Sequence, residues 1–582
     1  MPATAISHKR KADQALRDAV TQRPTGSLNV IISVSVGAHD AVRAALAAKG
    51  RAVTGEHPSI HAVSATIDAA DLADLERDPS VASISLNAVV TAHQTLPNPD
   101  APVTLNVLRP MVGAAAAATG QGVGVAVIDS GIQDRPDLHP LIKAFYDFTV
   151  DGTARAGGAA DPFGHGTHIA ATIASTGQES GSLFRGVATG AQLIGLRVLD
   201  GYGNGTTSNV INALAFATSN KAALGIDVIN LSLGHPIYES VATDPLVQAV
   251  EAAVHAGIVV VVSAGNYGIN PATGQPGYGG ITSPGNAPSA ITVGAVNTSG
   301  TLSRSDDVVA PYSSRGPTWV DGFAKPDLVA PGHRLVADTS GGSYLYKQYP
   351  AWQFKTSGAA GAYERLSGSS MAAAVASGVA ALVLQANRTT LEADGTRMAP
   401  LNPYAVKAVL ESTATPLAGA DPLTQGAGEL NADGAVALVR ALDTRTAPWT
   451  VSGLSPTTTF GAETDSWSGT LMWGAMQMQG LAPGGAVSGA NVVWGSNVVW
   501  GTNIVWGSNV VWGTNIVWGS NVVWGTNIVW GSNVVWGTNV VWGSNVVWGT
   551  NIVWGSNVVW GTSLSATDTA TTASSCGVEV CF

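Results

Sequence analysis

A series of short apolar runs constrains the fold of this chain more than any other feature. Four of them have the length and β-branched content of buried strands: 122–129, 193–199, 228–234 and 259–266. Segments with a helical pattern separate these runs, and strands that alternate with helices indicate a parallel sheet covered on both faces. We therefore expect an α/β fold from about residue 110, with its chemistry at the carboxyl ends of the strands.

Polar side chains stand at two of these strand ends. Asp129 ends the first run at a sharp Ser-Gly turn, which places a carboxylate at the carboxyl edge of the sheet. Asn266 follows Gly265 at the end of the last run and could offer its amide N–H groups to a site there. An ordinary turn residue is the alternative interpretation of Asn266.

Glycine-bounded turns deliver two more polar residues to helices of small residues. His165 lies in Phe-Gly-His-Gly-Thr-His, and Ser370 lies in Ser-Gly-Ser-Ser-Met ahead of an alanine-rich segment. A serine in the first helical turn has its hydroxyl beside unpaired N–H groups, which suits a nucleophile, although a simple N-cap is the alternative. His165 and His168 are three residues apart, but no glutamate lies between them and no third zinc ligand is evident.

Asp129, His165 and Ser370 follow one another in the chain order Asp, His, Ser. With Ser232-Leu-Gly, Ala264-Gly-Asn and Lys325-Pro-Asp-Leu-Val-Ala-Pro-Gly between them, the chain resembles the subtilisin-like serine proteases, or subtilases, over residues 110–442. The resemblance implies a catalytic domain at 97–445, built as a parallel sheet between helices. It also implies a serine endopeptidase that acts on proteins or peptides and needs no cofactor for its chemistry.

The resemblance assigns a role to each residue of this set. Ser370 would attack the scissile carbonyl and form an acyl-enzyme, and His165 would take and return the proton. Asp129 would hold the imidazole tautomer, and Asn266 with the Ser370 N–H would form the oxyanion hole.

The resemblance also implies substrate contacts and a metal ligand. Two edges would pair with an extended substrate: Asp200, Gly201 and Gly203 on one side, and Ser232, Leu233 and Gly234 on the other. The specificity pocket would include Ala264, Gly265 and Thr282. Because Thr282 stands where glycine is common, we expect a shallow pocket for small to medium apolar residues before the scissile bond. Asp137 matches a calcium ligand of the family, so we expect structural calcium, although no other ligand can be traced.

Residues 28–96 alternate as strand, helix, strand, strand, helix and strand, which indicates a ferredoxin-like α+β module. Its place before a protease suggests a propeptide that acts as chaperone and inhibitor and is later removed, so the enzyme would be a self-processing zymogen. Residues 1–27 form a polar segment ahead of it. The stretch 91–102, rich in proline and asparagine, would be the exposed joint that is cut.

Charge and hydropathy exclude some partners. The net charge of −11 argues against nucleic acid, and no apolar run reaches the length of a membrane span. Residues 1–23 lack the apolar core of a secretory signal. The resemblance nevertheless favours a secreted or cell-surface protein.

The C-terminal part is repetitive. After a linker at 446–490, residues 491–562 repeat the hexad Asn-Val/Ile-Val-Trp-Gly-Ser/Thr twelve times without a charge. Serine alternates with threonine, so the true repeat has twelve residues, two hexads per coil or hairpin. Valine, isoleucine and tryptophan favour strands, and a β-solenoid is our prediction, with surface attachment or self-association as its role. An aggregating polymer or a duplication without function are the alternatives. Residues 563–582 hold Cys576 and Cys581, as a disulfide or as two thiols.

Overall fold

The computed structural model describes residues 10–473 apart from 96–107, 115–117, 357–358, 446–448 and 452. Beyond residue 473 it describes the backbone of a series of strands. The chain divides into two units, of which the first holds nearly all of residues 10–473 and the second holds the repeats.

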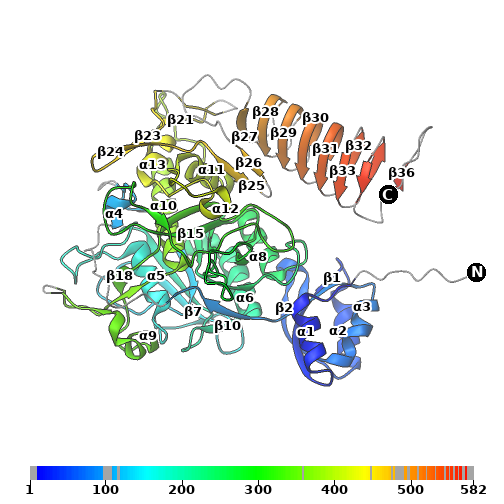
Figure 1. Cartoon of the computed structure of the whole chain (residues 1–582). Helices are drawn as coiled ribbons and strands as arrows, with labels where there is room; N and C mark the ends of the chain where they lie inside the picture. The colour runs from blue at the N-terminus through cyan, green and yellow to red at the C-terminus, as the bar shows by residue number, and fades with distance from the viewer. Residues whose placement is uncertain are drawn as a thin grey trace, which may run out of the picture. The chain divides into compact units, whose positions relative to one another are not determined.

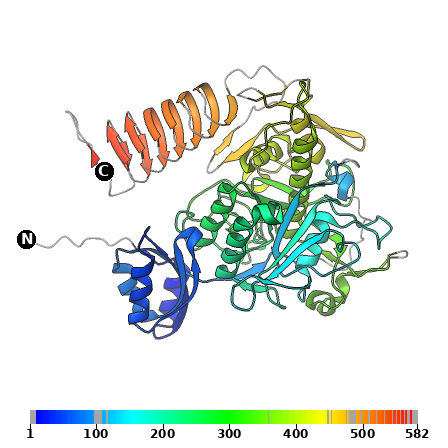
Figure 2. The ribbon, with the colours of Figure 1, turned by 180° about the vertical axis from the view of Figure 1, so that it is seen from behind.

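The N-terminal part of the first unit is a four-stranded antiparallel sheet with helices on one face (Figure 2). Its strand order is β2-β3-β1-β4. The elements are β1 (Ser27–Val34), α2 (His39–Ala48), β2 (Ala52–His57), β3 (Ala62–Asp68), α3 (Leu72–Arg77) and β4 (Val81–Leu86). Alternate residues of β1 point to opposite faces. Val30 and Ile32 pack under the helices, whereas Ile31 joins the core of the following domain.

The polar segment expected at 1–27 contributes to this sheet's core, which changes that prediction. Gln14–Gln22 form a helix, α1, capped by the Asp13 carboxylate, which accepts from the Leu16 N–H at 2.5 Å. Leu16 is fully buried among the apolar side chains of the sheet and its helices. A single buried leucine on a polar helix gives little signal in the sequence, because burial here depends on a partner sheet far along the chain.

The main sheet has nine strands and is parallel except at its two edges (Figure 1). Its order is β16-β15-β13-β11-β6-β9-β7-β8, with β17 also paired to β15. The bounds are β6 (Gly124–Asp129), β7 (Ile142–Asp147), β8 (Arg155–Ala156), β9 (Gln192–Arg197), β11 (Ile226–Leu231), β13 (Val259–Ser263), β15 (Ile291–Asn297), β16 (Val308–Val309) and β17 (Leu328–Pro331). The predicted α/β sheet is confirmed, and the four apolar runs of the sequence form its centre.

Helices cover both faces of this sheet. The helices are α5 (His165–Ala174), α6 (Thr207–Ser219), α8 (Pro245–His255), α10 (Ser369–Thr389), α11 (Pro403–Thr413) and α13 (Ala432–Ala441). On β11, Ile229 and Leu231 pack with α6 and α8, whereas Asn230 between them accepts from the Ser377 hydroxyl of α10 at 3.0 Å. Since neighbouring strand residues face opposite sides, α10 lies on the opposite face from α6 and α8.

Helix α10 is the one helix of the described residues that is long and apolar enough to cross a membrane. Buried residues make up 94% of its most apolar stretch, as in the core helix of a globular domain. Alanine, serine and glycine dominate it and let neighbouring segments pack closely on it, for instance at Gly378, where a Cβ would lie 2.6 Å from Cβ of Val187, in the loop after α5.

The stretch expected as an exposed joint is instead partly a strand. Val89–Ala92 form β5, which lies between β10 (Asn204–Thr206) and β12 (Leu233–Pro236) in the order β10-β5-β12-β14. The last strand, β14, is Thr282–Ser283. His93 and Thr95 continue the pairing by backbone hydrogen bonds, and the rest of the expected joint, 96–102, lies outside the described residues.

Part of the segment expected as a linker packs on the catalytic part. β23 (Thr457–Phe460) and β24 (Glu463–Ser466) form a hairpin, and Trp467 after it is buried, with its indole N–H donating to Thr458 Oγ1 at 2.9 Å. In β25 (Leu471–Trp473), the Met472 N–H donates to the buried Glu411 carboxylate at 2.9 Å. Residues 457–473 therefore belong to the first unit. Trp467 and Met472 are buried in it, although the surrounding sequence is largely polar.

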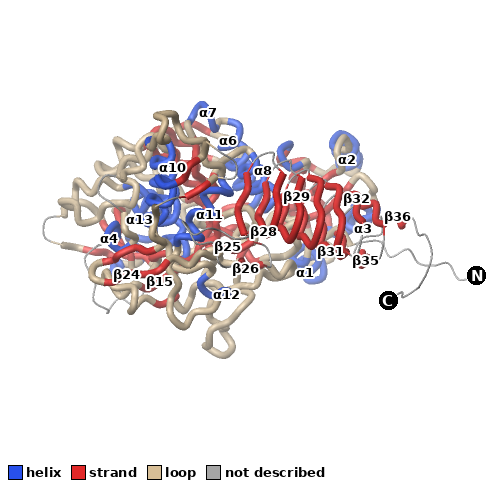
Figure 3. The backbone as a smooth tube through the Cα atoms, turned by 90° about the horizontal axis from the view of Figure 1, so that it is seen from above, coloured by secondary structure: helices blue, strands red, loops and turns tan. Residues whose placement is uncertain are grey.

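The second unit contains a ten-stranded sheet built from the repeats (Figure 3). Its strands are β27 (Ala490–Trp494), β28 (Val498–Trp506), β29 (Val510–Trp518), β30 (Asn521–Trp530), β31 (Asn533–Trp542), β32 (Asn545–Trp548), β33 (Asn551–Trp554), β34 (Asn557–Trp560), β35 (Ser563–Ser565) and β36 (Thr571–Thr572). From β27 to β35 each pairing is parallel with a register of twelve residues, such as Trp500 beside Trp512. Identical backbone positions therefore stack, as in coils rather than hairpins. Cys576 and Cys581 lie outside the described residues.

Candidate active site

Three chain segments carry the residues of the candidate site, and two of them bring Asp129 and His165 together at the carboxyl edge of the sheet. Asp129 is the last residue of β6, and His165 is the first residue of α5. The two side chains are fully buried, and His165 Nδ1 lies 2.7 Å from Asp129 Oδ1. The third segment, at the start of α10, carries Ser370. Glycine is required at Gly166, because a Cβ there would lie 2.1 Å from the Gly131 carbonyl oxygen.

Asp161 organises the turn that carries His165, and sequence reasoning missed it. Its Oδ1 accepts from Ser130 Oγ and the Gly164 N–H, and its Oδ2 accepts from the Thr167 N–H and hydroxyl, all within 2.9 Å. Burial raises the pKa of this carboxyl, which its hydrogen bonds partly offset. An aspartate shortly before a glycine-rich turn into a helix was the available signal.

The Ser370 hydroxyl is buried and donates to the Ser232 carbonyl oxygen at 3.0 Å. In return, Ser232 Oγ donates to the Ser370 carbonyl oxygen at 3.0 Å. Within the described part of the chain, His165 Nε2 is a buried nitrogen without a hydrogen-bond partner. His168 is separate from this site, because its Nε2 lies 3.1 Å from the Leu335 carbonyl oxygen and burial lowers its pKa to about 3.

Asn266 is anchored by one end of its amide. Its Oδ1 accepts from the Ser369 N–H at 2.9 Å and from the Ser369 hydroxyl at 3.0 Å. Its Nδ2 is buried and has no partner among the described residues. The neighbouring Ser370 N–H points toward a backbone carbonyl oxygen 3.4 Å away, that of His93. Two donors are therefore available beside the serine, which is the arrangement that an oxyanion requires.

The two edges that we expect to pair with a substrate differ in how they lie relative to β5. Leu233 and Gly234 of β12 pair with β5, next to Ser232, whose carbonyl oxygen accepts from the His93 N–H at 3.2 Å. On the other side the pairing begins at Asn204, beyond the residues that we expected.

Asp200, Gly201 and Gly203 form the turn before that edge. The Asp200 carboxylate accepts from the N–H groups of Tyr202 and Asn204 at 2.8 and 3.0 Å, which closes the turn. Gly203 has a φ of +81° and packs on Phe163, whose ring would lie 2.4 Å from a Cβ. These residues position the strand rather than pair with it.

Ala264, Gly265 and Thr282 lie together beside the site. The Thr282 N–H donates to the Ala264 carbonyl oxygen at 3.2 Å, and a Cβ on Gly265 would lie 2.9 Å from Thr282 Cγ2. Thr282 is buried, so the wall of this region is close-packed.

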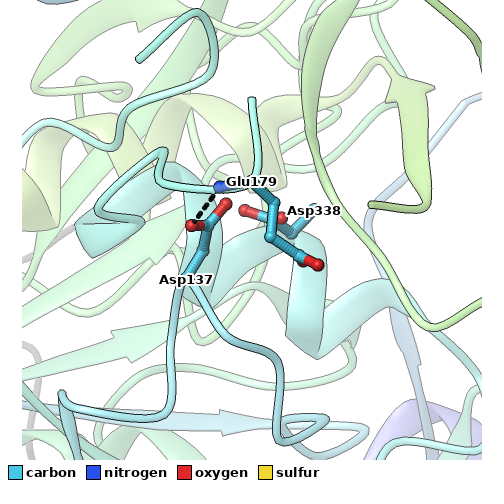
Figure 4. A group of neighbouring side chains, drawn as sticks. All are labelled: Asp137, Glu179 and Asp338. Carbon is cyan, nitrogen blue, oxygen red and sulfur yellow. Dashed lines mark hydrogen bonds between the residues drawn. The ribbon is translucent and has the colours of Figure 1, made fainter. Parts of the chain in front are cut away.

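Asp137 lies away from these residues, in a group with Glu179 and Asp338 (Figure 4). One ligand atom from each carboxylate lies within 4.8 Å of the others. Asp137 Oδ1 accepts from the Glu179 N–H at 2.9 Å, whereas Asp137 Oδ2 and Asp338 Oδ1 are buried and have no hydrogen-bond partner in the described residues. Glu179 also pairs with Arg135 at 2.6 Å.

Hard oxygen ligands with net negative charge are what calcium prefers, so this group fits a cation. Burial, and next the charge of Asp137, raise the pKa of Asp338 to about 7. A bound cation would reduce the repulsion between the Asp137 and Asp338 carboxylates that contributes to this raised pKa. Glu179 and Asp338 could not be found from the sequence, because 42 and 201 positions separate them from Asp137.

Comparison with known proteins gives one consistent result. Residues 120–435 match the model of the Subtilase family, Peptidase_S8. The chain is 39% identical to serine protease AprX of Bacillus subtilis (strain 168) over 323 residues, which is 55% of this chain and 67% of that protein. It is 34% identical to subtilisin E of Bacillus subtilis (strain 168) over 368 residues, 63% of this chain and 79% of that protein.

Among solved structures, fervidolysin from Fervidobacterium pennivorans has the same fold, with a TM-score of 0.54 and 24% identity. The likeness covers 71% of this chain and 61% of that chain.

Proposed function

This chain belongs to the subtilase family and is a serine endopeptidase, and from that premise we propose that Ser370, His165 and Asp129 carry its chemistry. The observation that supports this assignment best is the buried 2.7 Å contact between His165 Nδ1 and Asp129 Oδ1. The carboxylate holds the proton on Nδ1 and leaves the lone pair on Nε2. Nε2 is then a base with no competing partner in the described part of the chain.

Ser370 is the nucleophile of the proposed reaction. Its hydroxyl turns from the Ser232 carbonyl oxygen toward His165 Nε2, gives up its proton there and attacks the substrate carbonyl carbon. The oxyanion receives hydrogen bonds from the Ser370 N–H and Asn266 Nδ2, which are already oriented by the start of α10 and by Ser369. His165 then protonates the leaving amine, and water releases the acyl group by the same steps in reverse order.

The substrate is an extended peptide that adds a strand between β10 and β12. Backbone hydrogen bonds to both edges would supply affinity without regard to sequence, and side-chain pockets would supply preference. The chain's own strand β5 lies in this position between β10 and β12, which supports the proposal. While β5 is there, an external substrate cannot bind.

The enzyme is therefore made as a zymogen whose N-terminal part is an inhibitor until it is removed. The test compares the intact mass of the parent chain with that of Ser370→Ala after expression. We expect only the parent to lose its N-terminal part and to hydrolyse peptides. Loss of the same segment from Ser370→Ala would assign the cut to another protease, and an inert, uncut parent would contradict the proposed function.

The repeats would attach the enzyme to a surface or to another copy of itself, outside the cell. Their parallel register of twelve residues presents the same backbone position at every step, which is typical of a repetitive binding surface. Deletion of residues 491–562 should leave casein cleavage unchanged and abolish surface binding or self-association. Loss of casein cleavage would contradict an independent catalytic unit.

Asp137, Glu179 and Asp338 would hold calcium as a structural ion. Its role is to neutralise buried carboxylates, and no step of the proposed chemistry involves it.

A further inference from the structure

The segment after the N-terminal part crosses the candidate active site as a substrate would. In β5, Thr91 lies opposite Asn204 on one side and Gly234 on the other, and both pairings are antiparallel. Beyond β5, the His93 N–H donates to the Ser232 carbonyl oxygen at 3.2 Å, and the Thr95 N–H donates to the Ser367 carbonyl oxygen at 2.7 Å. These two bonds hold the backbone on either side of one peptide bond, that between His93 and Gln94.

The carbonyl group of this bond faces the proposed oxyanion hole. The Ser370 N–H donates to the His93 carbonyl oxygen at 3.4 Å. A Cβ on Gly368 would lie 2.3 Å from that oxygen and 3.2 Å from Asn266 Nδ2, so both groups flank the same glycine. The carbonyl carbon of His93 is thus presented to the buried serine.

The His93 side chain is buried and its ring contacts the hydroxyl of Ser263. The residue is 5% exposed, and its Nδ1 lies 2.8 Å from the Oγ of Ser263, the last residue of β13. The ring lies against Gly234, where a Cβ would come within 2.8 Å of His93 Cε1. Burial lowers the pKa of His93 to about 3, with the charges of His165 and His235 as smaller causes, so the ring is neutral.

We propose that the enzyme cuts its own chain between His93 and Gln94, and that Ser263 makes its specificity pocket selective for a neutral imidazole. This inference rests on the proposed function and replaces our expectation of a small or medium apolar residue before the scissile bond. An aliphatic residue there would leave the buried Ser263 hydroxyl with the Leu231 carbonyl oxygen, 3.4 Å away, whereas the neutral imidazole adds a partner at 2.8 Å. Ser263 touches the side chain alone and acts as a specificity residue.

The step balances within the chain and one water molecule. Ser370 Oγ bonds to the His93 carbonyl carbon, and its proton passes to His165 Nε2. The bond from that carbon to the Gln94 nitrogen breaks, and the nitrogen takes the proton from His165 as the new N-terminus. Water then displaces Ser370 from the acyl group, which leaves a carboxylate on His93 and restores the hydroxyl.

Intact mass and peptide mapping of the processed parent chain test the position of the cut. We expect a released fragment that ends at His93 and a mature chain that begins at Gln94. His93→Leu should process more slowly at the same bond, whereas Thr91→Ala, whose side chain is exposed, should process as the parent does. A first cut at any other bond would overturn the inference and leave the proposed function standing. A parent that neither processes nor hydrolyses peptides would overturn the proposed function itself.

A peptide series tests the selectivity separately, with the processed enzyme. Val-Thr-Ala-X p-nitroanilides with X as histidine or leucine give a ratio of kcat/KM for each enzyme. We expect the parent to have the higher kcat/KM for the histidine peptide. Ser263→Ala should lower the histidine-to-leucine ratio of kcat/KM about tenfold, because KM for the histidine peptide rises while the constants for the leucine peptide do not change. Ser263→Thr, which keeps a hydroxyl, should retain the preference. An equal loss on both peptides, or a parent that prefers leucine, would refute the role of Ser263.

Discussion

Replacing Glu239 by glutamine should keep the N-terminal part bound to the catalytic part at alkaline pH. Glu239 lines a small cavity with Asp13 and Asp244, where the start of α1 meets the loop after β12. Asp13 accepts from the Leu16 and Leu86 N–H groups, and Asp244 accepts from the N–H groups at the start of α8 and from the hydroxyl of Ser283. Burial raises the pKa of Glu239 to about 8, with the charge of Asp244 as the next cause.

The size of the effect follows from linkage. Glu239 binds a proton more tightly while the N-terminal part covers it. The complex of the N-terminal part with the catalytic part is therefore most stable below the ordinary pKa of 4.5, and this stabilisation is lost as pH rises through about 8. If the uncovered carboxyl returned fully to 4.5, the complex would weaken about 400-fold between pH 5 and pH 8. Part of the burial comes from the catalytic part alone, so we expect about 10- to 100-fold.

The assay uses the processed chain with its N-terminal part still bound. Peptide hydrolysis is measured directly after dilution at pH 5 to 9 and divided, at each pH, by the activity after that part has been degraded. Because the catalytic groups titrate in both measurements, their pH dependence cancels in this ratio. For the parent it should rise steeply toward pH 8, and for Glu239→Gln it should stay low and flat. Asp18→Asn removes an exposed carboxylate from α1 and should behave as the parent does. Identical profiles for Glu239→Gln and the parent would refute the reasoning.

Three other predictions concern buried charges and the bound strand. In the Ser370→Ala chain, Asp327→Asn should lower the free energy of unfolding in urea by about 3–5 kcal/mol, because it leaves two buried lysines, 2.7 and 3.0 Å away, without their shared partner. Calcium should raise the Tm of that chain by about 5 °C, and Asp338→Asn should remove the response to calcium and to chelators. Val90→Asp should slow self-processing about a hundredfold in a mass time course, because Val90 is buried, whereas exposed Val89→Asp should not. A change of under 1 kcal/mol, an unaltered calcium response, or equal rates for the two valine variants would contradict each prediction in turn.

The parallel sheet could be predicted because its strands are buried on both faces and appear in the sequence as continuous apolar runs. Asp129 stands at the end of such a run, and His165 and Ser370 stand in glycine-bounded turns. These local patterns place three reactive groups at strand and helix ends, and the order of the motifs identified the family. The structure adds the spatial relation, such as the 2.7 Å contact between two residues 36 positions apart.

The features that were missed all depend on partners distant in sequence. Asp161 is one aspartate among many until Ser130, which is 31 positions earlier, donates a hydrogen bond to its Oδ1. Leu16 is the one buried residue of α1, and its burial depends on the sheet that covers it. Met472 lies in a stretch that composition alone marks as a linker. Propensity and periodicity describe one segment at a time, so they cannot report burial that another segment provides.

The strand β5 likewise depends on partners that are distant in the sequence. The strand ends within 91–102, the stretch that its proline and asparagine content predicts to be an exposed joint. Its backbone is instead ordered by two edges that begin more than 100 residues later, at Asn204 and Leu233. Burial then falls on Val90 and His93, while Thr91 between them is exposed. A protease that processes itself would encode one of its own substrates, and under the self-processing proposed above the buried Val90 and His93 are the two side chains that the enzyme would recognise.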